Sequence, residues 1–114
     1  MTDTIFGKIA RGEIPADLIY EDEDCVAFRD ISPQAPVHIL IIPRKSIPTL
    51  DHAQPQDAEL IGKLFLAAAA VARQVGIADN GYRTVVNCNA AGGQTVFHLH
   101  VHLLGGRSLG WPPG

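Results

Sequence analysis

The chain has 114 residues, the length of one ordinary domain, and 46% of them are apolar while 18% are charged. This composition excludes an intrinsically disordered chain and allows a core that needs no disulfide or metal. The net charge of -3 argues against a nucleic-acid groove or an anionic membrane surface as the partner, whereas a small nucleotide stays compatible with it. We predict a single domain over residues 1–114, with a C-terminal tail from about residue 105 to 114.

The first half of the chain predicts one short helix and three strands. A helix is expected over residues 4–11, because Asp3 or Thr4 can cap it, an apolar stripe follows, and Gly12 can end it. Strands are expected for three apolar runs, at residues 18–20, 25–28 and 37–42. The third run is almost uninterrupted, which is typical of a buried central strand. The loop between the second and third strands contains two prolines, which block a helix there.

The second half predicts a long helix, two strands and a tail. Apolar residues recur at helical spacing over residues 57–75, and Gly76 follows as a stop. Between residues 64 and 72 this helix is apolar nearly all round, so either a second chain covers it or it is a well-packed core helix. Two more strands are expected at residues 83–89 and 97–104. The whole pattern predicts an α+β fold with an antiparallel five-stranded sheet.

Three of the five histidines alternate with apolar residues near the end of the chain, at His98, His100 and His102. A strand turns successive side chains to opposite faces, so we expect the three imidazoles in a row on one sheet surface. The apolar residues between them are expected in the core. Histidine has an unperturbed pKa of about 6.5, which suits the row to chemistry near neutral pH.

Three interpretations compete for this row. The first is a half-exposed strand with polar residues outward. The second is a zinc site, but the outer two histidines lie about 13 Å apart along a straight strand, so Cys88, His38 or another residue would have to complete it. The third is nucleophilic catalysis on phosphorus. The neighbouring turn Gly92-Gly93-Gln94-Thr95 favours the third, because its N–H groups and hydroxyl suit a phosphate.

The sequence resembles the histidine triad (HIT) superfamily over essentially its whole length. The segment His98-Leu-His-Val-His-Leu-Leu104 matches the family's signature of histidines alternating with apolar residues. Further segments resemble the histidine triad nucleotide-binding (HINT) branch, namely Phe6-Gly-Lys-Ile-Ala-Arg-Gly-Glu-Ile-Pro15, Asp30-Ile-Ser-Pro-Gln-Ala-Pro36, Gly93-Gln-Thr-Val-Phe-His98 and the ending Trp111-Pro-Pro-Gly114.

This resemblance implies a HIT-like fold, in which a five-stranded antiparallel sheet with one short and one long helix continues across a homodimer. It also implies a purine nucleoside phosphoramidase, a hydrolase that cleaves a P–N bond through a covalent nucleotidyl-histidine and releases a nucleoside monophosphate. The implied partners are a purine nucleoside phosphoramidate or monophosphate and a second copy of the chain. We expect no cofactor or metal, and the net charge argues against nucleic acid and membrane. A cytoplasmic location is expected, because the N-terminus lacks an apolar signal segment and two cysteines do not form a disulfide framework.

By the same resemblance, His100 is the nucleophile and His102 contacts the phosphate and the scissile bond. His98 and His38 are expected to support the row from behind, and Thr95 supplies a hydroxyl where well-known relatives carry serine. The remaining nucleotide-binding positions are Asp30 at the ribose hydroxyls, Asn87, Gly93, Gln94 and Val96 near the phosphate or ribose, and Ile5, Phe6, Ile9, Phe28 and Ile31 as an apolar slot for the base.

Two alternatives stay open at this stage, a nucleotide-binding regulatory protein without a catalytic purpose and a zinc-binding protein. Within the superfamily, the nucleotidyl-transferase branch carries Gln in place of the third histidine, so His102 favours hydrolysis over transfer. The ending Trp111-Pro-Pro-Gly114 favours the HINT branch over the dinucleoside-polyphosphate hydrolases.

Overall fold

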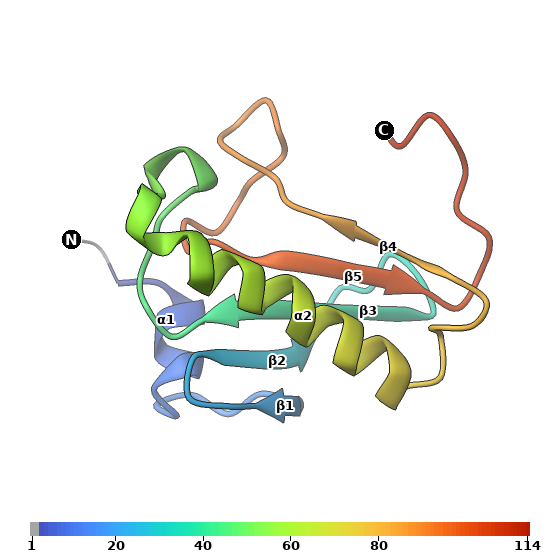
Figure 1. Cartoon of the computed structure of the whole chain (residues 1–114), viewed down its shortest axis with the longest axis horizontal. Coiled ribbons are helices and arrows are strands. Elements are labelled where there is room, and N and C mark those ends of the chain that lie inside the picture. The colour runs from blue at the N-terminus through green and yellow to red at the C-terminus, as the bar shows by residue number, and fades with distance from the viewer. Residues whose placement is uncertain (1–2) are drawn as a thin grey trace.

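The computed structural model describes residues 3–114 and contains five strands and two α-helices. The elements are, in chain order, α1 (Ile5–Ala10), β1 (Leu18–Glu21), β2 (Cys25–Arg29), β3 (Val37–Pro43), α2 (Ala58–Gln74), β4 (Tyr82–Val85) and β5 (Val101–Gly105). All strand pairs are antiparallel, in the order β1-β2-β3-β5-β4 (Figure 1). The predicted α+β fold, with its five-stranded antiparallel sheet and its short and long helix, is confirmed.

The two faces of the sheet are covered by different helices. Ile39 and Ile41 of β3 belong to the cluster that packs against α2, whereas Leu40 and Ile42 belong to the cluster around Phe6 of α1. β3 is therefore buried on both faces along nearly all its length, as the uninterrupted apolar run predicts. His38 alternates with Ile39, so its side chain faces the α1 side of the sheet.

Several predicted boundaries are correct to within a residue, and two strands are shorter than expected. Thr4 caps α1, because its hydroxyl accepts a hydrogen bond from the Gly7 N–H. β4 ends at Val85 and not at residue 89 as expected. Asn89 itself has a left-handed backbone conformation, with φ of 63°. β5 begins only at Val101 rather than at residue 97, because the Leu99 N–H bonds to the Ile47 carbonyl and not to the β3 ladder. The segment before β5 thus runs beside the loop that leaves β3.

α2 is buried on its sheet side and partly exposed on the other. Leu64, Ala68 and Val71 are almost fully buried, while Phe65 and Leu66 are 40% and 71% exposed. Within this single chain, the nearly all-round apolar stretch is therefore covered on the sheet side only. Of the helices in residues 3–114, none is long and apolar enough to cross a membrane.

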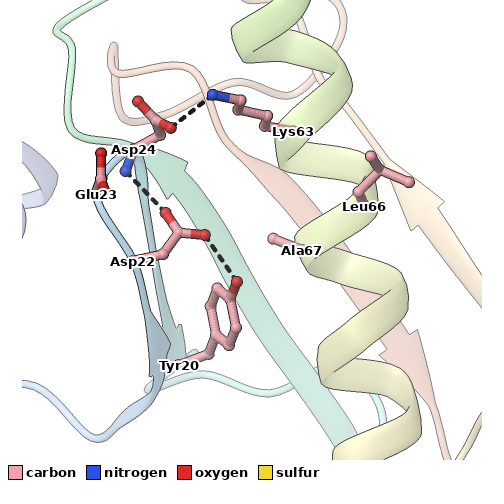
Figure 2. Close-up of a pocket in the computed structure, with 7 residues that line it drawn as sticks. All are labelled: Tyr20, Asp22, Glu23, Asp24, Lys63, Leu66 and Ala67. Carbon is pink, nitrogen blue, oxygen red and sulfur yellow. Dashed lines mark hydrogen bonds and ion pairs between the residues drawn. The ribbon is translucent and has the colours of Figure 1, made fainter.

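The acidic turn between β1 and β2 is fixed by hydrogen bonds and ties the hairpin to α2 (Figure 2). One oxygen of Asp22 accepts the N–H groups of Asp24 and Cys25 at 2.8 and 2.7 Å, and its other oxygen accepts the Tyr20 hydroxyl at 2.7 Å. Lys63 of α2 binds Asp24 at 2.9 Å. Ala67 of α2 belongs to the core cluster on this side, so the hollow in Figure 2 lies on the face opposite His38.

Candidate active site

The three histidines of the row come from the end of a loop and the start of a strand. His102 lies in β5 opposite Leu40 of β3, and His98 and His100 lie in the segment that precedes β5. His98 is 1% exposed and His100 is 6% exposed. The expectation that all three lie on the surface of one strand is therefore wrong, because His98 and His100 precede β5 and their rings are covered, with His100 against Phe6 of α1 and His98 against Pro43. The apolar residues between them are buried, as predicted.

His100 has one ring nitrogen fixed and one left free. Its Nδ1 lies 2.7 Å from the carbonyl oxygen of His98, and a carbonyl can only accept, so Nδ1 carries the proton. Nε2 is then the unprotonated nitrogen with an available lone pair. Phe6 packs edge-on against the ring, with centroids 5.0 Å apart. Burial lowers the pKa of His100, which keeps the ring neutral at neutral pH.

His38 and His102 form a hydrogen-bonded pair whose direction is set by the backbone. The Gln34 N–H donates to His38 Nδ1 at 3.0 Å, so the neutral His38 ring carries its proton on Nε2. That Nε2 lies 2.9 Å from Nδ1 of His102, which must therefore accept. The proton of His102 is then on Nε2, a buried atom that has no hydrogen-bond partner within residues 3–114. Burial, together with the neighbouring histidines, lowers the pKa of His102 to about 4.

The consequence is that two neighbouring imidazoles, packed edge-on with an interplanar angle of 64°, carry opposite groups on their Nε2 atoms. The ring centroids of His100 and His102 are 4.9 Å apart. His100 offers a lone pair and His102 offers an N–H donor, which together suit an electrophile that carries anionic oxygens, such as a phosphate ester or amide.

His98 serves the site through its carbonyl group. Its imidazole Nε2 donates to the Pro43 carbonyl at 2.7 Å, which fastens the segment before β5 to the end of β3. Its own carbonyl orients His100, as described above. The contact of His98 with His100 is therefore made by the backbone carbonyl, and burial lowers the pKa of the His98 imidazole.

Asp30, His38 and His102 have donor atoms within 4.8 Å of one another, a spacing that a metal ion could use. The proton directions argue against such a site. A metal would need the lone pair of His38 Nε2, but that atom carries the proton as long as Gln34 donates to Nδ1. Metal binding would thus have to break the Gln34 hydrogen bond, so the arrangement favours a hydrogen-bonded pair over a zinc ligand set.

The glycine-rich turn has fewer free donors than the sequence suggests. The Gly93 and Gln94 N–H groups donate to the carbonyls of Ala90 and Asn89, at 3.0 and 3.1 Å. No hydrogen bond within residues 3–114 uses the N–H groups of Thr95 and Val96, so these two remain for an anion. The Asn87 amide lies beside Gly93, because a Cβ added there would be 3.8 Å from Asn87 Nδ2.

The Gln94 side chain is also committed within the protein. Gln94 is 5% exposed, and its Nε2 donates to the carbonyls of Pro48 and Val96 at 2.8 and 3.1 Å. Its Oε1 accepts the Asn89 N–H at 2.9 Å. These three hydrogen bonds occupy the amide that the sequence analysis places near the nucleotide. The Gln94 side chain instead acts as a clamp that joins the glycine-rich turn to the loop after β3.

The predicted base slot is only partly assembled. Phe6 and Phe28 are buried with ring centroids 5.4 Å apart, and Ile9 packs against the same cluster. Ile5 is 51% exposed and Ile31 is 98% exposed. Asp30 directly follows β2. One of its carboxylate oxygens accepts the Ser32 N–H, and the other lies 3.5 Å from His38 Nε2.

Sequence reasoning missed the groups that line the approach to the turn and those that direct the histidine pair. A cavity of about 660 Å³ lies beside Thr95 and Val96, and Ser46, Pro48 and Phe97 contribute to it. The Gln34 N–H, which directs the His38–His102 hydrogen bond, is the second group that the sequence does not indicate. No sequence motif indicates it, because it is a backbone group of an irregular loop.

Comparison with known proteins assigns the chain to a family. The family model described as the HIT domain matches residues 11–109, so the chain belongs to the HIT family. It is 62% identical to a HIT-like protein of Synechococcus elongatus, over 98% of this chain and 97% of that one. It is also 54% identical to the purine nucleoside phosphoramidase of Escherichia coli, over 95% and 91% of the two chains. The crystal structure of a HIT family hydrolase from Legionella pneumophila matches 98% of this chain and 100% of its own, with a TM-score of 0.96 and 50% identity.

Proposed function

We propose that the protein hydrolyses the P–N bond of purine nucleoside phosphoramidates. The observation that carries this proposal is the set of ring hydrogen bonds that leaves Nε2 of His100 unprotonated and puts the proton of the neighbouring His102 ring on Nε2. The Escherichia coli relative named purine nucleoside phosphoramidase, at 54% identity over nearly the whole chain, supports the same reaction class.

In the proposed first step, His100 Nε2 attacks the α-phosphorus while the P–N bond breaks. The amine leaves with one proton taken from water, and the nucleotide stays bound to His100. The His98 carbonyl keeps Nδ1 protonated and stabilises the positive charge that the ring gains. In this proposal, the His102 N–H and the free N–H groups of Thr95 and Val96 donate to the phosphate oxygens as charge develops there.

In the second step, water attacks the same phosphorus and displaces His100. The nucleoside monophosphate is released, and the attacking water gives one proton to solvent, which replaces the proton that the amine took in the first step. We propose that Asp30 holds the ribose hydroxyls, and that Phe6, Phe28 and Ile9 form the floor beneath the purine. Ile5 and Ile31 would complete the slot as exposed walls, since an exposed apolar side chain gains by covering a base.

Turnover of adenosine 5′-phosphoramidate, followed as release of AMP, tests the proposal. The wild-type protein should turn over, and His100→Ala should lose at least about 10³-fold in kcat because the covalent route is closed. His52→Ala removes an exposed histidine outside the row and is the matched control. Alkaline quenching of the wild-type reaction, followed by mass spectrometry, should find the nucleotidyl group on His100. Undiminished turnover by His100→Ala would refute the mechanism, and tight AMP binding without any turnover would favour a regulatory protein.

We further propose that the protein acts as a homodimer. β4 is an end strand whose outer edge is unpaired within residues 3–114, and Phe65 and Leu66 of α2 are exposed apolar residues. Light scattering should give the mass of two chains at micromolar concentration. Leu66→Glu should shift the mass toward one chain, whereas Leu50→Glu, at a residue 45% exposed outside α2, should not. A wild-type mass of one chain would contradict the dimer.

We place the reaction in the cytoplasm. Cys25 and Cys88 are both unpaired, and free thiols are typical of a reducing compartment. Cys25 is fully buried and burial raises its pKa to about 11, so this thiol is chemically inert.

A further inference from the structure

The donor at His102 Nε2 depends on hydrogen bonds that begin outside the site. We propose that Arg107, in the tail after β5, is a positioning residue. It anchors the loop between β2 and β3, and the anchored loop holds His102 in the tautomer with its proton on Nε2. The catalytic consequence rests on the proposed function, whereas the tautomer itself can be observed without any substrate.

Arg107 is the first link of a chain of contacts that ends at the reacting atoms. Its Nη2 donates to the Gln34 carbonyl at 3.1 Å. Gln34 is held by a further hydrogen bond at 3.0 Å, from its own side-chain Nε2 to the Ser32 carbonyl. The N–H of the same residue donates to His38 Nδ1 at 3.0 Å, and His38 Nε2 bonds to His102 Nδ1 at 2.9 Å.

Every step of this chain has a fixed direction. A peptide N–H can only donate, so Nδ1 of His38 must accept and the His38 proton is on Nε2. That Nε2–H donates to Nδ1 of His102, so the His102 proton is also on Nε2. If the Gln34 peptide turned away, His38 could carry its proton on Nδ1. His102 could then donate from Nδ1 to His38 and would present a lone pair from Nε2. A lone pair repels a phosphate oxygen, so the reversed pair opposes the reaction.

The packing around Arg107 explains why it reaches this loop. Gly106 has φ of 88°, and a Cβ added to it would lie 2.9 Å from Pro36 Cβ. The absence of a side chain lets the tail press against the loop, which brings Arg107 next to Gln34. Residues 31–34 of the loop are exposed, so few contacts other than these hold them in place.

Nuclear magnetic resonance of the ¹⁵N-labelled histidine rings at neutral pH tests the proposal directly. In the wild-type protein, His38 and His102 should both appear as Nε2–H tautomers. Arg107→Ala should raise the Nδ1–H fraction of His102, and Gln34→Pro should raise it further because proline has no N–H to donate. Arg73→Ala removes one exposed arginine from α2 and the same charge, and should change neither ring.

Kinetics on adenosine 5′-phosphoramidate give the second readout. Arg107→Ala should lower kcat about 2- to 10-fold, the fold-change expected for one exposed hydrogen bond, with little change in KM. Arg73→Ala should match the wild-type protein. Unchanged ring tautomers in Arg107→Ala, or Nδ1–H tautomers in the wild-type protein, would overturn the proposal. A protein with the expected tautomers but no phosphoramidate turnover would overturn the proposed function and leave this inference intact.

Discussion

Replacing Gln94 with methionine should destabilise the protein and slow its proposed reaction, because the amide is a clamp. Methionine has nearly the same length but can make none of the three hydrogen bonds that join Gln94 to Asn89, Pro48 and Val96. A net contribution of about 1 kcal/mol for each bond gives a loss of about 3 kcal/mol. Water can reach the exposed Asn89 peptide, which reduces the expected loss to about 2–3 kcal/mol.

Urea unfolding and thermal melting measure this loss. For a domain of this size, 1 kcal/mol corresponds to about 4 °C in Tm, so Gln94→Met should melt about 8–12 °C below the wild-type protein. Gln74→Met is the matched control, because Gln74 is exposed and makes a single side-chain bond, to the Ile19 carbonyl. The control should stay within about 0.5 kcal/mol of the wild-type protein.

Kinetic constants distinguish a structural role of the Gln94 amide, as a clamp, from direct contact with the nucleotide. A clamp that fixes the N–H groups of Thr95 and Val96 acts on the transition state, so kcat should fall more than KM rises. An amide that touched the nucleotide would raise KM and leave the free energy of unfolding unchanged. A stability loss under about 0.5 kcal/mol together with a higher KM would refute the reasoning.

Three further predictions follow from the same contacts. Burial lowers the pKa values of the histidines at the site, so below about pH 6.5 the unfolded chain binds more protons than the folded chain; these are His38, His98, His100 and His102. The urea midpoint should therefore be constant above about pH 6.5 and fall as the pH is lowered toward about 4, and a midpoint independent of pH would contradict this. Thr95→Val should lower kcat by on the order of 10²-fold while Thr95→Ser keeps most of it, if the hydroxyl assists the phosphate, and equal rates would remove that role. Gly92→Ala would place a Cβ 2.5 Å from the Cys88 carbonyl oxygen, so urea unfolding should show a loss of about 1–3 kcal/mol; a stable variant would show that the turn can yield.

The sequence predicts the elements well and the site less evenly, for physical reasons. Helix caps and apolar periodicity are local signals, so α1, α2 and β3 are found within a residue or two. β5 is predicted too long because the alternation continues through His98 and His100. The bonds from the His98 ring to Pro43 and from the Leu99 N–H to Ile47 hold this segment outside the ladder. The direction of the His38–His102 bond is set by the Gln34 peptide, and a backbone group leaves no trace in residue identity.

The polarity of the histidine pair also indicates what can replace His102. The proposed mechanism needs an acceptor toward His38 Nε2 and a donor toward the phosphate at position 102, and a glutamine amide carries both groups. His102→Gln should therefore preserve the hydrogen bond from His38, with the amide oxygen as acceptor, and should still form the nucleotidyl adduct on His100. His102→Leu offers neither group and leaves the His38 Nε2–H with only the Asp30 carboxylate, 3.5 Å away, in place of an acceptor at 2.9 Å, so it should lower both adduct formation and stability. Rapid-quench mass spectrometry compares the two adducts, and equal adduct formation by glutamine and leucine would show that the donor at position 102 does not assist attack.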